Sequence, residues 1–207
     1  MSHAERRELW ERCWSAPTAV PGYFAPGELE QFVELRSEVF RKYLDGITEV
    51  SEFGCGTGHN LVPLIGTGRR LRGFDWALSA VRKCADLEIE SGWFDMLKPI
   101  DVEISGAVLT VHAMEQLGED WKQFLAYLLD QSPQICIHIE PIAELYDDSP
   151  RDQARLAYHR KRGYLTGYLT ELRMLRNEGL IDLIEVRKSP FGGKDHDAYS
   201  VIVWRPL

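Results

Sequence analysis

The sequence predicts an α/β fold, a doubly wound, mostly parallel seven-stranded sheet with helices on both faces and an antiparallel C-terminal hairpin. Two observations predict it. Strand and helix patterns alternate from residue 47 to about residue 177, and residues 180–207 contain two strand patterns around a Pro/Gly-rich turn. Because connections between parallel strands are right-handed crossovers, such an alternation covers the sheet with helices on both sides.

Composition and charge limit the class of protein. The 207 residues suit one domain, and the formal charge of −8 argues against a nucleic-acid partner, which would require a basic face. No apolar run approaches the ~20 residues of a membrane span, and residues 1–14 lack a secretory signal. The four cysteines are scattered, so we expect neither a disulfide framework nor a metal site, and a cytoplasmic location.

The first 45 residues are predicted to be a helical segment that precedes the sheet. A helix is expected over residues 5–14, then a loop with three prolines, and a second helix from near Pro26 and Gly27 through residue 44. Gly46 ends that helix. We therefore divide the chain into a segment 1–45 and a sheet domain 46–207, which together form one globular unit.

The strands and helices of the sheet domain follow from their hydrophobic spacing. Strands are expected at residues 47–53, 70–75, 89–97, 106–114 and 134–142, with two more inside residues 180–207. Helices are expected to begin at residue 60, directly after the glycines, and to cover residues 77–87, 119–131 and 152–177, the last interrupted by glycines.

Three glycines, Gly54, Gly56 and Gly58, stand within five residues between the first predicted strand and the helix expected after it. A tight turn alone needs one glycine, so three favour a site where main chain approaches a ligand. A dinucleotide fingerprint, G-x-G-x-x-G, would require Gly or Ala at position 59, where His59 stands. The pattern found is acidic-x-G-x-G-x-G, with Glu52 at the strand end.

This pattern resembles the first motif of the class I S-adenosylmethionine (SAM)-dependent methyltransferases. The resemblance implies that Asp75, after the second strand, accepts hydrogen bonds from the ribose hydroxyls of SAM, with Trp76 beside it. A helix N-cap is the alternative role for Asp75. It also implies that Asp95 accepts from the adenine amino group, with Phe94 and Met96 on the ring. The complete set of expected SAM-binding residues adds Cys55, Asn60 and Thr110 to these and to the motif residues Glu52, Gly54, Gly56 and Gly58.

Candidate catalytic residues lie where the fourth and fifth strands end. Methyl transfer requires alignment of the acceptor with the methyl group, and a base only if the acceptor loses a proton. His112 is the first candidate for that base and Glu140 the second, while Glu115 is expected to bind substrate or to cap the next turn. His138 shares a strand face with Glu140, and a hydrogen-bonded core role is an equally weighted alternative for it.

In the family that the sequence resembles, the segments before the first strand and after the fifth commonly form a lid over the acceptor. The resemblance therefore implies an N-terminal helical lid with Trp10 and Trp14. Aromatic residues at helical spacing are usually core residues. The lid role is therefore expected of these aromatic residues as a group, and a core role is the alternative for each one taken alone. Expected substrate-binding residues are Tyr23, Phe24, Tyr158, His159 and Tyr164.

A basic run at residues 151–162 stands out in an otherwise acidic chain. A solvated helix face is the default interpretation of such a run. Arg151 and Arg155 share one helical face, so the alternative is a clamp for a phosphate or carboxylate of the substrate.

Together these features predict a SAM-dependent methyltransferase that transfers a methyl group to an oxygen or nitrogen of a small-molecule biosynthetic intermediate, with a sugar or nucleotide-linked sugar as the favoured class. The alternatives are a SAM-binding subunit without catalysis and, less favoured, a NAD-dependent oxidoreductase. Nucleic acid and membrane are not expected as partners, and a homodimer is left open.

Overall fold

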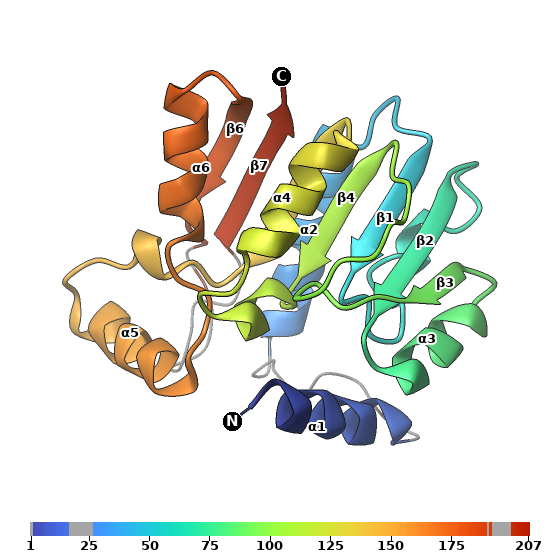
Figure 1. Cartoon of the computed structure of the whole chain (residues 1–207), viewed down its shortest axis with the longest axis horizontal. Coiled ribbons are helices and arrows are strands. Elements are labelled where there is room, and N and C mark those ends of the chain that lie inside the picture. Colours follow the sequence, from blue (N-terminus) through green and yellow to red (C-terminus); the bar gives the residue numbers. More distant parts are fainter. Residues whose placement is uncertain (1, 17–26, 190, 192–199) are drawn as a thin grey trace.

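A seven-stranded sheet with the order β3-β2-β1-β4-β5-β7-β6 forms the centre of the computed structural model, which describes residues 2–16, 27–189, 191 and 200–207 (Figure 1). The strands are β1 (Glu49–Phe53), β2 (Arg70–Asp75), β3 (Glu90–Trp93), β4 (Ala107–Val111), β5 (Ile135–Glu140), β6 (Ile181–Arg187) and β7 (Ser200–Pro206). Strands β1 to β5 pair in parallel, and β7 pairs antiparallel with both β5 and β6. The predicted fold class is confirmed.

The C-terminal hairpin enters the sheet in a way that the pattern alone does not specify. Strand β7 lies between β5 and β6, so the antiparallel strand is inside the sheet and β6 is the outermost strand. Strand β7 is antiparallel to β5, and β6 is antiparallel to β7. Strand β6 therefore runs in the same direction as the first five strands. The carboxyl end of β6 therefore lies at the same edge of the sheet as the carboxyl ends of β1 to β5.

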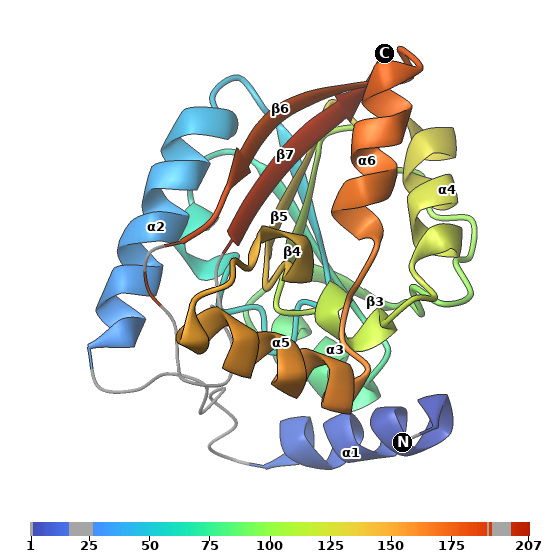
Figure 2. The same ribbon diagram turned by 90° about the vertical axis from the view of Figure 1, so that its left-hand side faces the viewer.

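Helices cover both faces of the sheet (Figure 2). They are α1 (His3–Ser15), α2 (Glu28–Tyr43), α3 (Leu78–Ala85), α4 (Lys122–Gln131), α5 (Pro150–Arg162) and α6 (Tyr168–Asn177), with short 3₁₀ turns η1 (Val62–Leu64), η2 (Met114–Leu117) and η3 (Ala143–Leu145). One apolar cluster joins α2 and Cys84 of α3 to the sheet, and a second joins α4 and α6 to its opposite face. No described helix is long and apolar enough to cross a membrane.

The alternation of side chains along β5 shows how one strand serves both clusters. Ile137 and Ile139 belong to the cluster under α2, whereas Cys136 belongs to the cluster under α4 and α6. Since successive strand residues point to opposite faces, His138 and Glu140 lie on the same side as Cys136. The predicted alternation of this strand is confirmed.

The helix expected directly after the glycines does not form. Only the 3₁₀ turn η1 is present, closed by hydrogen bonds such as Leu64 N to Leu61 O (2.8 Å). Pro63 has no N–H to donate to a helical ladder, and Gly66 has a φ of +77°, which ends any continuation. The prediction of a helix beginning at residue 60 was wrong for these local reasons.

Two helices lie at the edge of the sheet where the parallel strands end. Figure 1 shows α1 lying across the edge to which the arrowheads of β1 and β4 point, and Figure 2 shows α5 close to the same edge. In open α/β sheets this edge is where ligands bind. The fold therefore places the glycine loop, α1 and α5 around one region.

Candidate functional site

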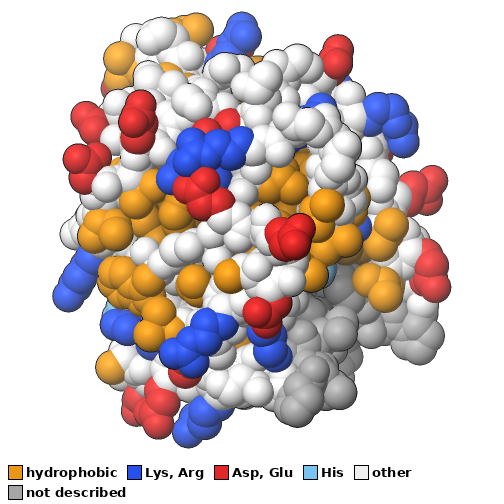
Figure 3. All heavy atoms as spheres, turned by 90° about the vertical axis from the view of Figure 1, so that its right-hand side faces the viewer, with side chains coloured by type: hydrophobic (Ala, Val, Ile, Leu, Met, Phe, Trp, Pro, Cys, Tyr) orange, Lys and Arg blue, Asp and Glu red, His pale blue; other side chains and the backbone are white. Residues whose placement is uncertain are grey.

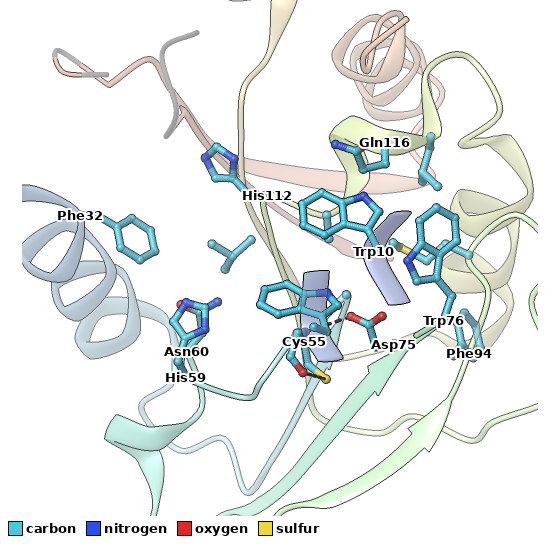
Figure 4. Close-up of a pocket in the computed structure, with 17 residues that line it drawn as sticks. Trp10, Phe32, Cys55, His59, Asn60, Asp75, Trp76, Phe94, His112 and Gln116 are labelled. Atoms are coloured by element: carbon cyan, nitrogen blue, oxygen red, sulfur yellow. Dashed lines mark hydrogen bonds between the residues drawn. The ribbon is translucent and has the colours of Figure 1, made fainter. Parts of the chain in front are cut away.

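A cavity lies at this edge, between α1, the glycine loop and the ends of β2 and β4 (Figure 4). Its lining residues are Trp10, Trp14, Phe32, Gly54, Cys55, Gly56, His59, Asn60, Asp75, Trp76, Phe94, Met96, Val111, His112, Ala113, Gln116 and Leu117. Nine of the residues expected to bind cofactor or to catalyse are among them: Gly54, Cys55, Gly56, Asn60, Asp75, Trp76, Phe94, Met96 and His112. The described residues contain no group of three or more His, Cys, Asp or Glu that could hold a metal ion.

The glycine loop depends on the absence of side chains for both its conformation and its packing. Gly54 has a φ of +74°, and a Cβ added there would lie 2.2 Å from Cβ of Ala113. Gly56 has a φ of +52°, and its Cβ would lie 2.9 Å from Cζ2 of Trp14. Left-handed backbone and close packing both require glycine at these positions, and both residues line the cavity.

Asp75 ties the glycine loop to the end of β2. Its Oδ2 accepts a hydrogen bond from Gly56 N (3.0 Å), and its Oδ1 accepts one from Ala77 N (2.8 Å). Burial raises the pKa of Asp75 to about 6, although these backbone donors oppose the shift. The carboxylate lines the cavity, so it combines a structural role in the loop with a position from which it can accept from a ligand.

A polar network lies beneath the loop, on the side of α2. Asn60 donates from Nδ2 to Glu52 Oε1 (2.8 Å) and accepts at Oδ1 from Nη1 of Arg36 (3.0 Å). The same Nη1 reaches the carbonyl of His59 at 3.4 Å. Burial raises the pKa of Glu52 well above its usual range and lowers that of His59 to about 4. Glu52 does not line the cavity itself, but it is joined to the lining residue Asn60.

Three buried polar atoms of this network have no hydrogen-bond partner among the described residues. They are Oε2 of Glu52, Nε of Arg36 and Nδ1 of His59. Leaving a buried polar atom unsatisfied costs roughly 1–3 kcal/mol, so such a group of donors and acceptors is expected where a polar ligand completes the bonding. Of the three residues, His59 lines the cavity, whereas Glu52 and Arg36 are joined to it through Asn60.

The other end of the cavity is aromatic and apolar. Phe94 and Met96 line it, while Asp95 between them is buried and accepts from Leu97 N (3.0 Å). Oδ2 of Asp95 also lies 3.4 Å from Nε2 of His3. Asp95 is therefore adjacent to the cavity rather than in its lining.

Helix α1 forms one wall of the cavity. The rings of Trp10 and Trp14 stack with centroids 5.7 Å apart, and both line the cavity (Figure 4). Arg6 donates from Nη1 to the carbonyl of Gln116. Glu11 accepts at its carboxylate from Ser79 N (3.2 Å), which fixes α1 against the start of α3. Two tryptophans of the segment that is expected to form a lid thus line the cavity.

His112 and Glu115 come together at the end of β4. Nδ1 of His112 lies 3.4 Å from Oε2 of Glu115, and both side chains are largely buried. His112 has a φ of +52°, which is uncommon for a residue other than glycine. Its main-chain N–H donates to the carbonyl of Ile139 (3.1 Å). Because Glu115 contacts one ring nitrogen of a side chain that lines the cavity, it can orient the imidazole.

Glu140, the second catalytic candidate, lies behind this pair rather than in the cavity lining. Its Oε1 accepts from Ala113 N (3.0 Å) and Met114 N (3.1 Å), so it caps the start of η2. Burial raises the pKa of Glu140 to about 7, and the nearby charge of His112 opposes the shift. This geometry favours a role in positioning His112 over direct contact with a substrate.

His138 is part of the core. Its Nδ1 bonds the hydroxyl of Thr110 (2.8 Å), and its Nε2 meets the hydroxyl of Tyr168 (2.9 Å) and Nε1 of Trp204 (3.0 Å). Burial lowers the pKa of His138 to about 3, so the ring is neutral. The structure therefore favours the core alternative for His138, and it places Thr110 in the same buried network rather than in the cavity lining.

The expected substrate-binding residues after the fifth strand form a separate group. His159 of α5 bonds the hydroxyl of Tyr146 at 3.1 Å, and the ring of Tyr164 packs against Tyr158 with centroids 5.9 Å apart. None of Tyr158, His159 and Tyr164 is among the cavity-lining residues. Tyr23 and Phe24 lie outside the described residues. The remaining motif glycine, Gly58, packs against Cys84 instead of the cavity.

Several lining residues escaped the sequence-based prediction. Phe32 lies on a helix whose apolar spacing predicts only a core face, and His59 was used solely to exclude a dinucleotide site. Arg36, on the same helix, does not line the cavity but bonds the lining residue Asn60. Gln116 and Leu117 follow His112 by one turn of η2. A contact between a helix and a loop far along the chain leaves no signal in the local sequence. Of these residues, only those in the turn after His112 could have been predicted.

Comparison with known proteins supports the fold. Sequence comparison finds no match to a protein-family model or to a curated protein. Among solved structures, the chain is similar to the N-methyltransferase NodS from Bradyrhizobium japonicum in complex with S-adenosyl-L-homocysteine (TM-score 0.69, 16% identity, covering 97% of each chain). It is similar to magnesium protoporphyrin IX methyltransferase from Synechocystis with bound S-adenosyl-L-homocysteine (0.67, 12%, 100% of each chain). It also resembles the mitomycin 7-O-methyltransferase MmcR (0.62, 12%, covering 100% of this chain and 59% of that chain). The chain therefore has the fold of the class I SAM-dependent methyltransferases.

Proposed function

We propose that this protein is a SAM-dependent methyltransferase that acts on an oxygen or nitrogen of a small molecule. The observation that carries the proposal is that Gly54 and Gly56 line one cavity with His59 and Asn60, and that Asn60 joins it to Glu52 and Arg36. Glu52, Arg36 and His59 each have an unsatisfied polar atom. SAM carries an amino-acid group with one ammonium and one carboxylate, which these atoms complement. A nicotinamide dinucleotide has no such group and would instead present a pyrophosphate.

Other residues of this chain would bind the ribose and the adenine of SAM. Asp75 would accept from the ribose hydroxyls, and Phe94 and Met96 would pack on the adenine, with Asp95 behind them. Two charge-assisted hydrogen bonds of ~1.5–3 kcal/mol each would hold the sugar. The bound cofactor supplies an activated methyl group on a sulfonium.

The chain's own contribution to the reaction is alignment and proton removal. Trp10 and Trp14 line the cavity and would exclude water from it around a bound cofactor. His112 lines the cavity and would accept a proton from the acceptor at the ring nitrogen that does not face Glu115. A positioned general base supplies ~10²–10⁴-fold in rate. Glu140 would hold the turn that carries His112.

A small acceptor suits the charge of the molecule better than a nucleic acid. The chain has a formal charge of −8, and the face over β3 and α3 carries acidic and basic side chains interspersed, without a continuous basic area (Figure 3). A sugar or nucleotide-linked sugar remains the favoured acceptor class. The structural neighbours named for N- and for O-methylation support either acceptor atom.

The experiment that tests the function has two stages. Calorimetric titration with S-adenosylhomocysteine (SAH) and with NAD⁺ identifies the cofactor: we expect SAH to bind and NAD⁺ not to bind. Incubation with labelled SAM and a metabolite extract then shows whether a methyl group is transferred. Binding of NAD⁺ in place of SAH would reject the proposal, and SAH binding without any labelled product would favour a non-catalytic SAM-binding subunit.

A further inference from the structure

Two cysteines that are far apart in the sequence meet beside the glycine loop. Cys55 belongs to the loop and lines the cavity, and Cys84 lies in α3. A Cβ added at Gly73 of β2 would lie 2.5 Å from Sγ of Cys84 and 3.0 Å from Sγ of Cys55. The two sulfurs are therefore at most about 5.5 Å apart, the sum of these two distances. Both cysteines are free thiols in this structure.

The two thiols of this pair differ in access and in acidity. Cys84 is completely buried, whereas Cys55 lines the cavity, so a small solute in the cavity can contact the Cys55 sulfur. A hydrogen bond with the Cys84 thiol raises the pKa of Cys55 well above its usual range, and the same bond lowers the pKa of Cys84. Cys55 is therefore the sulfur that an oxidant reaches, and Cys84 is the better nucleophile of the two.

A bond between these sulfurs would displace the glycine loop. A disulfide has an S–S distance of ~2.05 Å, so the two sulfurs must approach each other. The main chain of Cys55 is held to β2, because its N–H donates to the carbonyl of Phe74 (3.0 Å). The movement therefore falls on the Cys55 side chain and on the next residue, Gly56. The Cys55 thiol contacts the carbonyl of Gly56 at 3.5 Å, and the Gly56 N–H donates to Asp75 (3.0 Å).

We propose that Cys55 and Cys84 form a reversible disulfide when hydrogen peroxide oxidises the protein, and that this disulfide weakens cofactor binding at the glycine loop. The effect on the cofactor rests on the proposed methyltransferase function, whereas the formation of the disulfide does not. The bond from Gly56 to Asp75 joins the loop to the proposed acceptor for the ribose, so a shift of Gly56 changes that part of the site.

The oxidation takes place in two balanced steps. In the first, the Cys55 sulfur attacks a peroxide oxygen, the O–O bond breaks, and water leaves with the thiol proton, which gives a sulfenic acid. In the second, the Cys84 sulfur attacks the sulfur of Cys55, the S–O bond breaks, and a second water leaves with the Cys84 proton. Two thiols thus lose two electrons, which reduce one peroxide to two waters.

Mass spectrometry tests the disulfide without any knowledge of the methyl acceptor. The full chain is treated with increasing hydrogen peroxide, and the monomer is analysed without reductant. We expect the loss of two hydrogen atoms and a proteolytic fragment in which Cys55 and Cys84 are linked, both reversed by dithiothreitol. Peroxide that oxidises the exposed Cys13 but gives no such fragment would overturn the proposal.

A matched pair of variants identifies the sulfurs involved. Cys84→Ala removes one partner, and Cys136→Ala removes an equally buried cysteine that packs under α4 and α6. The loss of two hydrogen atoms should disappear in Cys84→Ala and persist in Cys136→Ala. The same loss in both variants would show that other cysteines react and would reject the pair. The linked fragment of the wild type decides the question even if Cys84→Ala does not fold.

Calorimetric titration with SAH measures the effect on the cofactor site. Oxidised wild type should bind SAH about tenfold more weakly or less than reduced wild type, and dithiothreitol should restore the affinity. Peroxide treatment should leave the SAH affinity of Cys84→Ala unchanged. Bound SAH should in turn slow the formation of the disulfide, because it occupies the cavity from which peroxide reaches Cys55.

These results distinguish a failure of this proposal from a failure of the proposed function. A linked Cys55–Cys84 fragment together with equal SAH affinity in the two states would reject the effect on the cofactor and leave the methyltransferase function intact. Absence of SAH binding in the reduced wild type would reject the methyltransferase function, and with it the effect on the cofactor, whereas the fragment would still establish the disulfide.

Discussion

At the scale of single residues, Asp75 accepts hydrogen bonds from the main chain of the glycine loop and is the proposed acceptor for the ribose of SAM. Asp75→Ala removes the acceptor proposed for the ribose and should weaken SAH binding about 100-fold or more, from the loss of two charge-assisted hydrogen bonds. Calorimetric titration measures the change, and circular dichroism checks that the fold is kept. Asp86→Ala, at the exposed end of α3, is the control. Unchanged SAH affinity in Asp75→Ala would remove Asp75 from the site.

His112 offers a second test at this scale, and its backbone decides which variant is informative. With a φ of +52°, Asn is the better replacement, because it tolerates the left-handed region and carries no base. His112→Asn should lower methyl transfer from labelled SAM ~10²–10⁴-fold while leaving SAH affinity within about threefold. Full transfer activity in His112→Asn would show that no base acts at this position.

The sequence was sufficient to predict the residues that a local pattern marks. Gly54, Gly56 and Asp75 follow strand ends in a fixed order, and all three line the cavity. It was not sufficient for Arg36, because a buried arginine on an apolar helix face has no local signature for its contact with Asn60. For His138, residue type and strand position fit catalysis and core equally, and only the partners Tyr168 and Trp204 distinguish them.

At the scale of elements, α1 is the lid candidate that the structure places over the glycine loop. Trp14 packs against Gly56 and belongs to a small apolar cluster with Ala77 and Ala80, separate from the two main clusters. Trp14→Ala should therefore leave the fold intact and increase the dissociation rate of SAH about tenfold, which corresponds to about 1.4 kcal/mol of lost contact. Stopped-flow displacement measures that rate.

The control for this variant is Arg12→Ala. Arg12 lies on the same helix, where its Nη1 is 3.6 Å from Oε1 of Glu8, and both side chains are exposed. Exposed pairs contribute little, so Arg12→Ala should leave the dissociation rate unchanged. If Trp14→Ala behaves in the same way as Arg12→Ala, α1 does not retain the cofactor, and the division of the chain at residue 45 has no functional meaning.

At the scale of the whole molecule, buried titratable groups have opposite effects on how stability depends on pH. Burial raises the pKa of Glu140 to about 7 and of Asp75 to about 6, so the folded state gains stability as pH falls through these values. Burial lowers the pKa of His138 to about 3 and of His59 to about 4, so the unfolded state gains protons first, and stability is lost below about pH 6.5. The two effects oppose each other below about pH 6.5, whereas above it the gain from Glu140 predominates.

A variant of Glu140 isolates the contribution of one of these groups to the pH dependence of stability. Glu140→Gln keeps an oxygen that accepts from Ala113 and Met114 but does not titrate. From pH 8 to pH 6, the free energy of unfolding of the wild type should rise by about 1 kcal/mol relative to that of Glu140→Gln. Urea unfolding at both pH values measures the difference. A difference that does not change with pH would mean that Glu140 does not titrate in this range.

The topology of the sheet could be predicted only as far as the periodic strands and helices determine it. Alternating strands and helices predicted a parallel sheet with a hairpin, but the insertion of β7 between β5 and β6 depends on pairing between strands far apart in the chain. The short η1 turn replaced an expected helix because Pro63 and the positive φ of Gly66 outweigh an apolar run. Both differences leave the strand ends, and therefore the cavity, where the motif order predicts them.

The structure of a crystal soaked with SAH tests the central claim most directly. The account predicts the ribose hydroxyls at the carboxylate of Asp75 and the amino-acid group among Glu52, Arg36 and His59, so that their unsatisfied atoms are bonded. A glycine loop without ligand after soaking, or SAH bound elsewhere on the molecule, would contradict it.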